Sequence, residues 1–501
     1  MRALFLLYIA SLISCNDISH FKSDVQEKHI SKVASPFYRD SLKTLAANFI
    51  VKNIGNDGSV IVTVKSSSND SIINLDSYNN RYESITSILD SSDVYYANQY
   101  VPDSSQLSTS YIRNNIDKTF QMLECTSWQD RIEFNKVCKY VLPYRIGNEE
   151  LENWRDLVIE NNLDILDTIK YGLPMLEVSN LICENIRKRF KFSASEYKDD
   201  WLLSYSELYK TKKGTCIGFA KLNMYTLRAF GIPTYLDFVP FWGNAEGSHY
   251  WNSLDIQNHS YVSSWENGLL PVREFVNNTE YSTEVRFAPK VFRFESYKTR
   301  TNCNHPSDIG KVYDFLSNEK IRDVTDEYMS TGSIRVKIDN QSYFKKIALL
   351  TVFNGGKWQS VDWGEISGDG HLEFYKVGKQ VIYQVQVYDD KKMKPLTSPF
   401  LFDRKAQLEF LDGKQGQQTL MINSWNYNPA LPHIDYSIHA DHDYVFYYWQ
   451  AEEWQSIQAE VSNNYLLIGN VPSNCLYRIV NKNEGTSGRI FTVQDKNIKW
   501  K

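Results

Sequence analysis

The sequence lacks the clusters of cysteine and histidine that hold structural zinc. Its 501 residues include seven cysteines and nine histidines, and no two cysteines have CxxC spacing. A structural zinc site needs four nitrogen or sulfur ligands held close together. We therefore expect no metal site, and no residue pattern implies an organic cofactor.

The sequence also has no excess of positive charge. Lysine and arginine together number 55, against 60 aspartates and glutamates, for a formal net charge of −5. Proteins that bind nucleic acids neutralise phosphates with lysine and arginine, so we expect no nucleic-acid partner. Hydrophobic residues make up 42% of the chain, which is enough for several cores, and this length requires more than one domain.

The apolar run at the start of the chain is too short to cross a bilayer. Met1-Arg2 is a short charged start, and residues 3–13 form an apolar stretch of signal-peptide length. Leu12-Ile13-Ser14-Cys15 has the form of a bacterial lipobox. We predict cleavage before Cys15, lipidation of its thiol, and an exported protein that this lipid anchors in the bacterial cell envelope, either periplasmic or on the cell surface.

Cys216 stands at the start of a predicted helix. Gly214-Thr215 supplies a turn and an N-cap, and Gly231 followed by Pro233 ends the helix. The apolar residues between them recur at helical spacing: Ile217, Ala220, Met224, Leu227 and Phe230. Unpaired N–H groups and the helix dipole in the first turn favour a thiolate and lower the pKa of a cysteine. A lone cysteine at a helix start is more often a small, buried apolar residue than a nucleophile. The residues around Cys216 therefore decide between these two interpretations.

His249 supplies that context. Residues 234–239 are rich in strand formers, and the glycine-bounded loop 243–247 leads to a predicted strand in Ser248-His249-Tyr250-Trp251-Asn252. A thiol at a helix start, with an imidazole brought beside it by a sheet, is the minimum that a cysteine nucleophile needs. Trp251 is expected to pack in the core, and Asn252 has no predicted role.

Glu266 is the predicted partner of the His249 ring. The strand should turn near residues 257–259 and return as an antiparallel strand. With a two-residue loop, position 249 faces position 266 directly; with the loop one residue later, Glu266 is a diagonal neighbour. Ser264 is the alternative partner, and a solvated strand end is an equally good interpretation of Glu266. Asp255 is set aside, because six residues of strand separate it from His249 by roughly 20 Å.

Three features follow one another: Gly-Thr-Cys opens a helix, His-Tyr-Trp-Asn lies on a strand, and an acidic residue comes one strand later. This combination resembles the transglutaminase-like superfamily. The resemblance implies a papain-like core with a Cys-His-Asp triad. Cys216 would be the nucleophile, His249 the general base and acid, and the Cys216 backbone N–H part of an oxyanion hole. Glu266 stands where the family has aspartate. The family's second oxyanion donor is an upstream side chain, and spacing alone assigns it to neither Trp201 nor Tyr205.

The rest of the chain divides into regions by its periodicity. Helical periodicity dominates from about residue 36 to 190, apart from a mixed, Ser/Asn/Asp-rich stretch at 57–110, and strand patterns follow from about residue 330. We predict an α+β fold with these parts: a signal peptide and lipobox at 1–15, a tether at 16–35, a helical region at 36–165, a transglutaminase-like core at 166–325, and two small sandwich-like β modules at 326–405 and 406–501.

The resemblance also narrows to a group of bacterial lipoproteins with a transglutaminase-like core behind a helical region. Residues 45–50, Tyr140-Val141-Leu142-Pro143-Tyr144-Arg145, Trp154-Arg155 and the β modules carry it. If Cys15 is lipidated and Cys216 stays reduced, an odd set of cysteines remains, which cannot pair completely within one chain. These are Cys125, Cys138, Cys183, Cys303 and Cys475.

The predicted chemistry is acyl transfer through a thioester on Cys216. Hydrolysis of an amide in a peptide or protein is the first expectation, a peptidoglycan amidase the second, and crosslinking the third. The alternative from another class is a catalytically silent surface lipoprotein that binds a glycan or peptide through its β modules.

Overall fold

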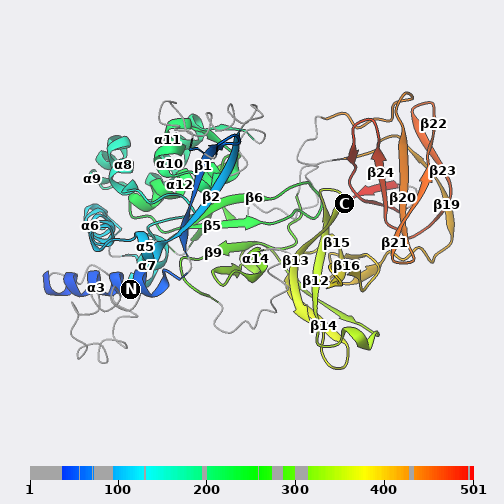
Figure 1. Cartoon of the computed structure of the whole chain (residues 1–501), viewed down its shortest axis with the longest axis horizontal. Coiled ribbons are helices and arrows are strands. Elements are labelled where there is room, and N and C mark those ends of the chain that lie inside the picture. The colour runs from blue at the N-terminus through cyan, green and yellow to red at the C-terminus, as the bar shows by residue number, and fades with distance from the viewer. Residues whose placement is uncertain are drawn as a thin grey trace. The chain divides into compact units, whose positions relative to one another are not determined.

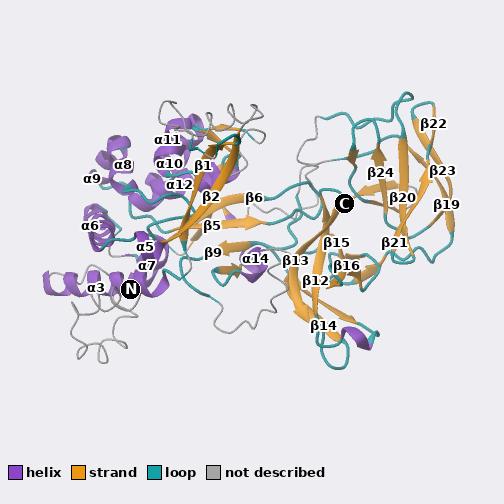
Figure 2. Cartoon of the chain, viewed as in Figure 1, coloured by secondary structure: helices purple, strands orange, loops and turns teal. Residues whose placement is uncertain are grey.

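The computed structural model describes residues 36–55, 57–69, 71–72, 94–128, 131–193, 200–257, 259–272, 286–299, 314–427, 434–494 and 497–501. The predicted signal peptide, Cys15 and the tether lie outside these residues. The expected mixed fold is confirmed, because helices dominate the first part of the chain and strands the last (Figure 2). None of the described helices is long and apolar enough to cross a membrane.

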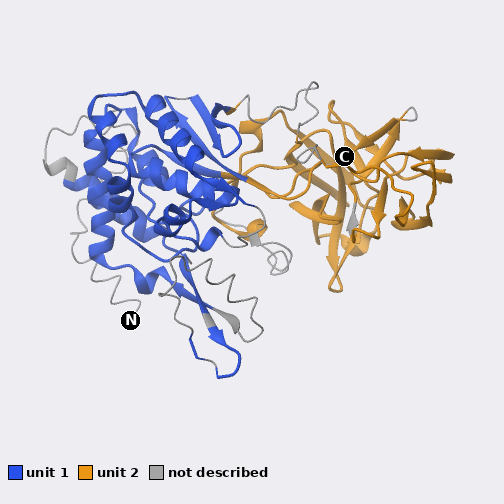
Figure 3. Ribbon diagram, turned by 90° about the horizontal axis from the view of Figure 1, so that it is seen from above, with its two compact units in different colours: residues 1–236, 250–271, 294–298 blue, residues 237–249, 272–293, 299–501 orange. Residues whose placement is uncertain are grey.

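The chain forms two compact units (Figure 3). The first comprises Met1–Leu236, Tyr250–Pro271 and Phe294–Lys298, and the second comprises Asp237–His249, Val272–Arg293 and Thr299–Lys501. Each is described separately below.

Most helices belong to the first unit (Figure 1). They are α3 (Pro36–Asn53), α5 (Asp103–Gln106), α6 (Thr109–Cys125), α7 (Phe134–Tyr140), α8 (Trp154–Asn161), α9 (Leu163–Lys170), α10 (Met175–Arg189), the 3-10 helix η3 (Asp200–Leu202), α11 (Tyr205–Thr211) and α12 (Cys216–Ala229). Helix α3 lies at the start of the region of expected helical periodicity and buries Leu42, Ala46 and Ile50.

A two-stranded antiparallel sheet interrupts these helices where a mixed and partly loop-like stretch was expected. It pairs β1 (Gly58–Ser66) with β2 (Val94–Pro102). The β-branched run at residues 60–64 favours a strand, because such side chains pack well on a pleated surface. The Ser/Asn/Asp-rich residues around that run made its strand pattern hard to recognise from the sequence.

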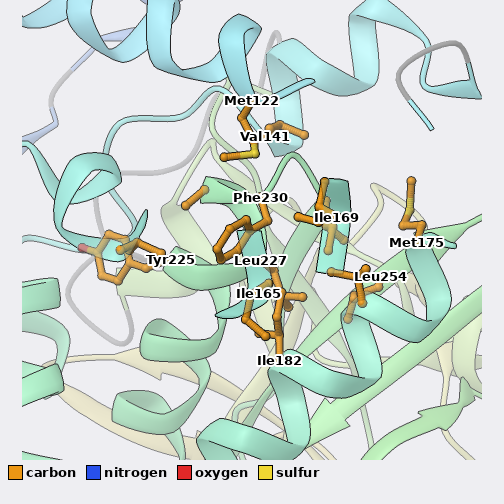
Figure 4. Packing of buried hydrophobic residues seen from close by; sticks show 14 of the residues in the cluster. Met122, Val141, Ile165, Ile169, Met175, Ile182, Tyr225, Leu227, Phe230 and Leu254 are labelled. Atoms are coloured by element: carbon orange, nitrogen blue, oxygen red, sulfur yellow. The ribbon is translucent and has the colours of Figure 1, made fainter. Parts of the chain in front are cut away.

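Helix α12 is the centre of the first unit. Every residue from Gly218 to Ala229 is buried, so the helix has no solvent-exposed face beyond its first turn. A helix that is covered on all sides belongs in a core rather than on a surface. Figure 4 shows Tyr225 and Leu227 of α12, and its C-cap Phe230, in one apolar cluster with Ile165, Ile169 and Ile182.

A six-stranded sheet has the order β10-β9-β5-β6-β7-β8. Its strands are β5 (Thr234–Val239), β6 (His249–Ile256), β7 (His259–Ser264), β8 (Gly268–Pro271), β9 (Phe292–Phe294) and β10 (Ile321–Asp323). Ile256 pairs with His259, and Asn252 with Ser263. Two residues therefore connect β6 to β7, as in the first of the two predicted registers. A short parallel pair, β3 (Lys191–Phe192) with β4 (Lys213–Gly214), precedes α12.

The second unit includes the C-terminal β region, residues 332–501. Its first strands are β11 (Gly332–Lys337), β12 (Ile347–Asn354), β13 (Lys357–Glu365), β14 (His371–Val377), β15 (Val381–Asp389), β16 (Lys392–Pro395), β17 (Phe400–Phe402) and β18 (Leu408–Phe410). The later strands are β19 (Gln417–Ile422), β20 (Tyr444–Gln450), β21 (Glu453–Gln458), β22 (Glu460–Ser462), β23 (Tyr465–Pro472), β24 (Tyr477–Asn481), β25 (Thr486–Ser487), β26 (Phe491–Gln494) and β27 (Asn497–Trp500).

The turns of this β region agree with the sequence pattern. Gly355 and Gly356, both at positive φ, join β12 to β13 as a hairpin within the region of expected strand patterns. A second hairpin in this region pairs β20 with β21. Short helices α14 (Asp314–Ser317) and α15 (Thr325–Tyr328), with the 3-10 helix η5 (Gln341–Tyr343), complete the described elements.

A buried ion pair ties α12 to the segments beside it in the first unit. The Lys221 ammonium donates to Glu149 Oε2 at 3.0 Å and to the carbonyls of Trp201 at 2.7 Å and Leu203 at 2.8 Å. Tyr225 donates to Glu149 Oε1 at 2.7 Å. Burial alone would raise the pKa of Glu149, but the charges of Lys221 and Arg145 and its hydrogen bonds lower that pKa to about 2. Lys221 thus fixes α12 against the 201–203 segment.

Replacing Lys221 with methionine tests this arrangement. The variant keeps an unbranched apolar side chain but leaves the Glu149 carboxylate buried without its ammonium partner. Removing one member of a buried pair costs about 3–5 kcal/mol. We expect Lys221→Met to lower the free energy of unfolding of the first unit by this amount, measured by urea denaturation of the full chain.

The matched control is Lys118→Met. Lys118 pairs with Asp156 at 2.6 Å on the same unit, but 42% of its side chain and 34% of its partner's are exposed. Exposed pairs contribute at most about 1 kcal/mol. Equal losses of stability in the two variants would contradict the structural role of Lys221.

Candidate active site

The first turn of α12 holds Cys216 as predicted. Thr215 is the N-cap, and its hydroxyl accepts a hydrogen bond from Ile217 N at 3.3 Å. Cys216 is the first helical residue, is half-buried and forms no disulfide. The local sequence therefore does place a free thiol at a helix N-terminus.

A buried carboxylate, not anticipated from the sequence, caps this helix. Asp200 Oδ2 accepts hydrogen bonds from Thr215 N at 2.6 Å, Thr215 Oγ1 at 2.6 Å and Gly218 N at 3.1 Å. Asp200 is only 2% exposed, and burial raises its pKa above the ordinary value although these hydrogen bonds oppose the shift. Its other oxygen, Oδ1, makes no hydrogen bond to the residues that the structure describes.

Two glycines make room for Asp200. A Cβ atom on Gly214 would lie 2.9 Å from Asp200 Oδ2, and one on Gly218 would lie 2.7 Å from it. Neither glycine has a positive φ, so close approach of the carboxylate, rather than backbone conformation, excludes a side chain at both positions. The Gly-x-x-x-Gly spacing around Cys216 was the one sequence signal that could have suggested a group packed on this turn.

The start of β6 lies against the thiol. The backbone of Tyr250 hydrogen-bonds Cys216 and lowers the pKa of the thiol. The Trp201 side chain hydrogen-bonds the Tyr250 phenol, and their rings meet edge to face at 5.7 Å. Of the two upstream side chains considered, Trp201 therefore lies near the site. Tyr205 is instead buried in α11, where its phenol accepts a hydrogen bond from Asn161 at 3.4 Å.

The resting thiol is not acidified. The pKa of Cys216 is raised to about 11, chiefly by burial; the backbone of Tyr250 lowers it, and the negative charges of Asp200 and Glu266 add to the rise. The expectation of a lowered pKa is therefore wrong for the thiol taken by itself. The main reason is burial, which disfavours the charged thiolate, and the Asp200 carboxylate at the helix N-terminus adds to it.

Glu266 lies in the turn after β7 rather than on the strand, and it is half-buried. Its charge acts on Cys216, which places the carboxylate within electrostatic range of the thiol. Ser264, the alternative, is buried at the end of β7, and its hydroxyl accepts a hydrogen bond from Asn267 N at 3.3 Å. Asp255 pairs with Lys136 at 2.6 Å.

His249 is the first residue of β6, and only 5% of it is exposed. Its ring lies 6.3 Å from that of Trp242, centroid to centroid. His249 belongs to the second compact unit, while Cys216 and Tyr250 belong to the first. The pairing of Cys216 with His249, and of His249 with Glu266, therefore stays a prediction.

A buried amide pair joins α12 to β6 and β7. Asn223 Nδ2 donates to Asn252 Oδ1 and to Ser263 Oγ, each at 3.0 Å, and Asn252 Nδ2 donates to the Ala220 carbonyl at 3.0 Å. Such contacts fix the helix that carries Cys216 in one position along the strand that begins with His249. Asn252, which had no predicted role, is thus a positioning residue.

The described residues contain no group of three or more His, Cys, Asp or Glu side chains that could hold a metal ion.

Residues 168–264 match the sequence model of the Transglutaminase-like superfamily. The matched segment contains Cys216 and His249 and ends before Glu266. The chain therefore contains a transglutaminase-like domain, in which α12 and β6 carry these two residues. A comparison with curated proteins found no match.

Three solved structures are similar to this chain. A proposed cysteine protease from Cytophaga hutchinsonii is 16% identical over 26% of this chain and 45% of its own, with a TM-score of 0.20. A proposed protease from Parabacteroides distasonis is 10% identical over 43% of this chain and 42% of its own, with a TM-score of 0.17. Red sea bream transglutaminase is 9% identical over 89% of this chain and 78% of its own, with a TM-score of 0.22. The chain spans less than half the length of the first two.

Asp200→Asn is expected to lower the pKa of Cys216. Asparagine can keep its oxygen at the position of Oδ2, with all three hydrogen bonds, and place its amide nitrogen where Oδ1 makes none. Only the negative charge, which raises the thiol pKa, is lost. The rate of alkylation of Cys216 by iodoacetamide, followed by peptide mass spectrometry, should reach its midpoint at lower pH than in the native protein.

Asp156→Asn serves as the control, because this carboxylate lies on α8 and pairs with Lys118. It should leave the pH profile of Cys216 unchanged. An unchanged or upward-shifted midpoint in Asp200→Asn would show that the Asp200 charge does not act on the thiol.

Proposed function

We propose that the protein is a cysteine hydrolase or acyltransferase that acts on amide bonds through a thioester. The observation that supports this most directly is the free thiol of Cys216 on the first turn of α12, inside a transglutaminase-like domain. Asp200 holds that turn, and Asn223 holds the same helix further along against Asn252. An ordinary buried cysteine does not need such support.

In the first half of the reaction, His249 removes the proton from Cys216, and the thiolate sulfur attacks the amide carbonyl carbon. The new C–S bond gives a tetrahedral oxyanion, which the backbone N–H of Cys216 helps to stabilise. His249 then donates its proton to the leaving nitrogen as the C–N bond breaks. The products are a free amine and a thioester on Cys216.

In the second half, His249 takes a proton from water, and the resulting hydroxide attacks the thioester carbonyl. The C–S bond breaks, the carboxylic acid leaves, and the proton returns to the sulfur. An amine in place of water would give transamidation. Hydrolysis of a peptide or protein amide is our first proposal, and a peptidoglycan amide is the second.

The raised pKa of Cys216 makes the base essential to this proposal. A thiol whose pKa is about 11 is almost entirely protonated at neutral pH, so it cannot act as a nucleophile unaided. An imidazole that accepts the proton provides a cation that offsets the carboxylates of Asp200 and Glu266. In this proposal Glu266 takes the place of the family's aspartate and orients the His249 ring.

The same observation favours a second candidate function. If no imidazole accepts the proton, the two carboxylates keep Cys216 as an unreactive thiol. The transglutaminase-like domain would then be a silent scaffold, and the C-terminal β region would act by binding a glycan or peptide. The reactivity of Cys216 distinguishes the two functions.

In native protein we expect Cys216 to react with iodoacetamide at neutral pH faster than Cys125, the exposed free thiol of the described chain. In His249→Ala the reaction at neutral pH should fall at least about tenfold. It should recover only as the pH rises toward the value of about 11 that burial and the carboxylates impose on the thiol. Peptide mass spectrometry over a pH series measures both.

Cys125 provides the internal control, because its labelling should be the same in both proteins. Slow labelling of native Cys216, with no change in His249→Ala, would exclude the enzyme and leave the silent scaffold.

We also propose that the protein is exported and anchored in the bacterial cell envelope through a lipid on Cys15. The proposal rests on the lipobox-like Leu12-Ile13-Ser14-Cys15 behind an apolar run of signal-peptide length. Cys15→Ser should move the expressed protein from the membrane fraction to the soluble fraction or leave it with an uncleaved leader. Intact-mass measurement of native protein should show a lipid adduct, and a native protein without one would refute the anchor.

A further inference from the structure

The loop that leads into β6 is closed on itself within the second unit. It runs from Trp242 to Gly247, and Trp242 N donates to the Gly247 carbonyl at 3.2 Å. Gly247 has a φ of +80°, which glycine adopts without strain. His249 follows two residues after Gly247. The backbone of this loop therefore determines where the first residue of β6 begins.

Asn354, at the end of β12, binds the loop from the C-terminal β region. Its Oδ1 accepts a hydrogen bond from Gly247 N at 3.0 Å. Its Nδ2 lies within hydrogen-bonding distance of the carbonyls of Ala245 at 2.8 Å and Trp242 at 3.1 Å. Asn354 is only 3% exposed, so water does not compete for these groups. One amide side chain thus lies within hydrogen-bonding distance of backbone groups at both ends of the loop.

Arg489 binds the same loop from near the C-terminus of the chain. Its Nη2 donates to the Gly243 carbonyl at 2.6 Å, and its Nη1 reaches Glu246 Oε1 at 3.1 Å. Nη1 also donates to the Phe353 carbonyl at 2.7 Å, beside Asn354. Only 1% of Arg489 is exposed. The planar guanidinium therefore holds the loop and the end of β12 in one fixed geometry.

Two further contacts leave the loop little freedom. The second carboxylate oxygen of Glu246 accepts a hydrogen bond from Gly355 N in the β12–β13 turn. A Cβ atom on Gly243 would lie 2.6 Å from a methyl group of Val381 on β15, so the loop backbone packs directly on that strand. The loop is thus attached to the β region through hydrogen bonds and through close packing.

Both ends of the loop lie close to His249, one in space and the other along the chain. Its first residue, Trp242, places its ring 6.3 Å from the His249 ring, and its last residue, Gly247, is separated from His249 only by Ser248. Any shift of the loop therefore moves the imidazole or its neighbour. Displacement of a catalytic group by about 1 Å can lower a rate by about a hundredfold.

We propose that Asn354 and Arg489 are positioning residues for His249, and that the C-terminal β region holds the base of the catalytic site in place through the 242–247 loop. This inference rests on the proposed function, in which His249 takes the proton of Cys216. It gives the β region a part in the reaction that binding of a glycan or peptide does not require.

The test compares the pH dependence of Cys216 alkylation in full-length variants. Arg489→Lys keeps the charge but loses the planar fork, and Glu246→Ala removes two contacts at a side chain that is 34% exposed. Both should lower the rate at neutral pH at least about tenfold and shift the profile toward that of His249→Ala. Arg335→Lys is the control, because Arg335 lies on β11 of the same β region and pairs with Glu373 on β14 at 2.8 Å. It should keep the native profile.

The outcomes separate the inference from the function on which it rests. Native profiles in both Arg489→Lys and Glu246→Ala, while His249→Ala is impaired, overturn the positioning role alone. A native profile in His249→Ala overturns the proposed function and the positioning role together. If circular dichroism shows that Arg489→Lys does not fold, Glu246→Ala decides alone, because its side chain is partly exposed and its loss removes no core packing.

Discussion

The carboxylate of Asp200 at the start of α12 is the contact on which the candidate site depends. It fixes the N-cap Thr215 and the amide of Gly218, and so it determines where the intervening Cys216 lies. It can do so only because Gly214 and Gly218 carry no side chain. Lys221, one turn further along α12, binds the carbonyl of the adjacent Trp201. The capping carboxylate and the helix are therefore held together by two independent contacts.

This arrangement has an electrostatic consequence for the thiol. A helix N-terminus usually favours a thiolate, but here a buried carboxylate already uses the N–H groups, and burial and negative charge raise the pKa of Cys216 to about 11. The turn thus gives a well-placed but protonated thiol. In the proposed function reactivity comes from His249 acting as the base, and without a base the protonated thiol is protected from oxidation.

His249, the proposed base, is flanked by a strand held by nearby residues and a loop held by distant ones. The β6–β7 pairing and the Asn223–Asn252 contact hold the strand that continues from His249. The loop before His249 is instead held by residues more than 100 positions away along the chain. If the proposed function holds, a domain matched by residues 168–264 uses side chains from the C-terminal β region to keep its base in place.

Local chemistry allowed much of this protein to be predicted from its sequence. The helix from Cys216, its Thr215 cap and the Gly355-Gly356 turn follow from periodicity, capping and glycine, which act over a few residues. The sequence left two registers open for β6 and β7, and the structure has the one with a two-residue connection. Asp200, the Glu149–Lys221 pair, Asn252 and Arg489 left no such signal. Their roles arise from contacts between segments distant in sequence, and a buried polar side chain acquires its partner only when the chain is packed. The thiol's position was thus a property of the sequence, whereas its protonation and its surroundings were decided by the tertiary structure, because desolvation and charge act through space rather than along the chain.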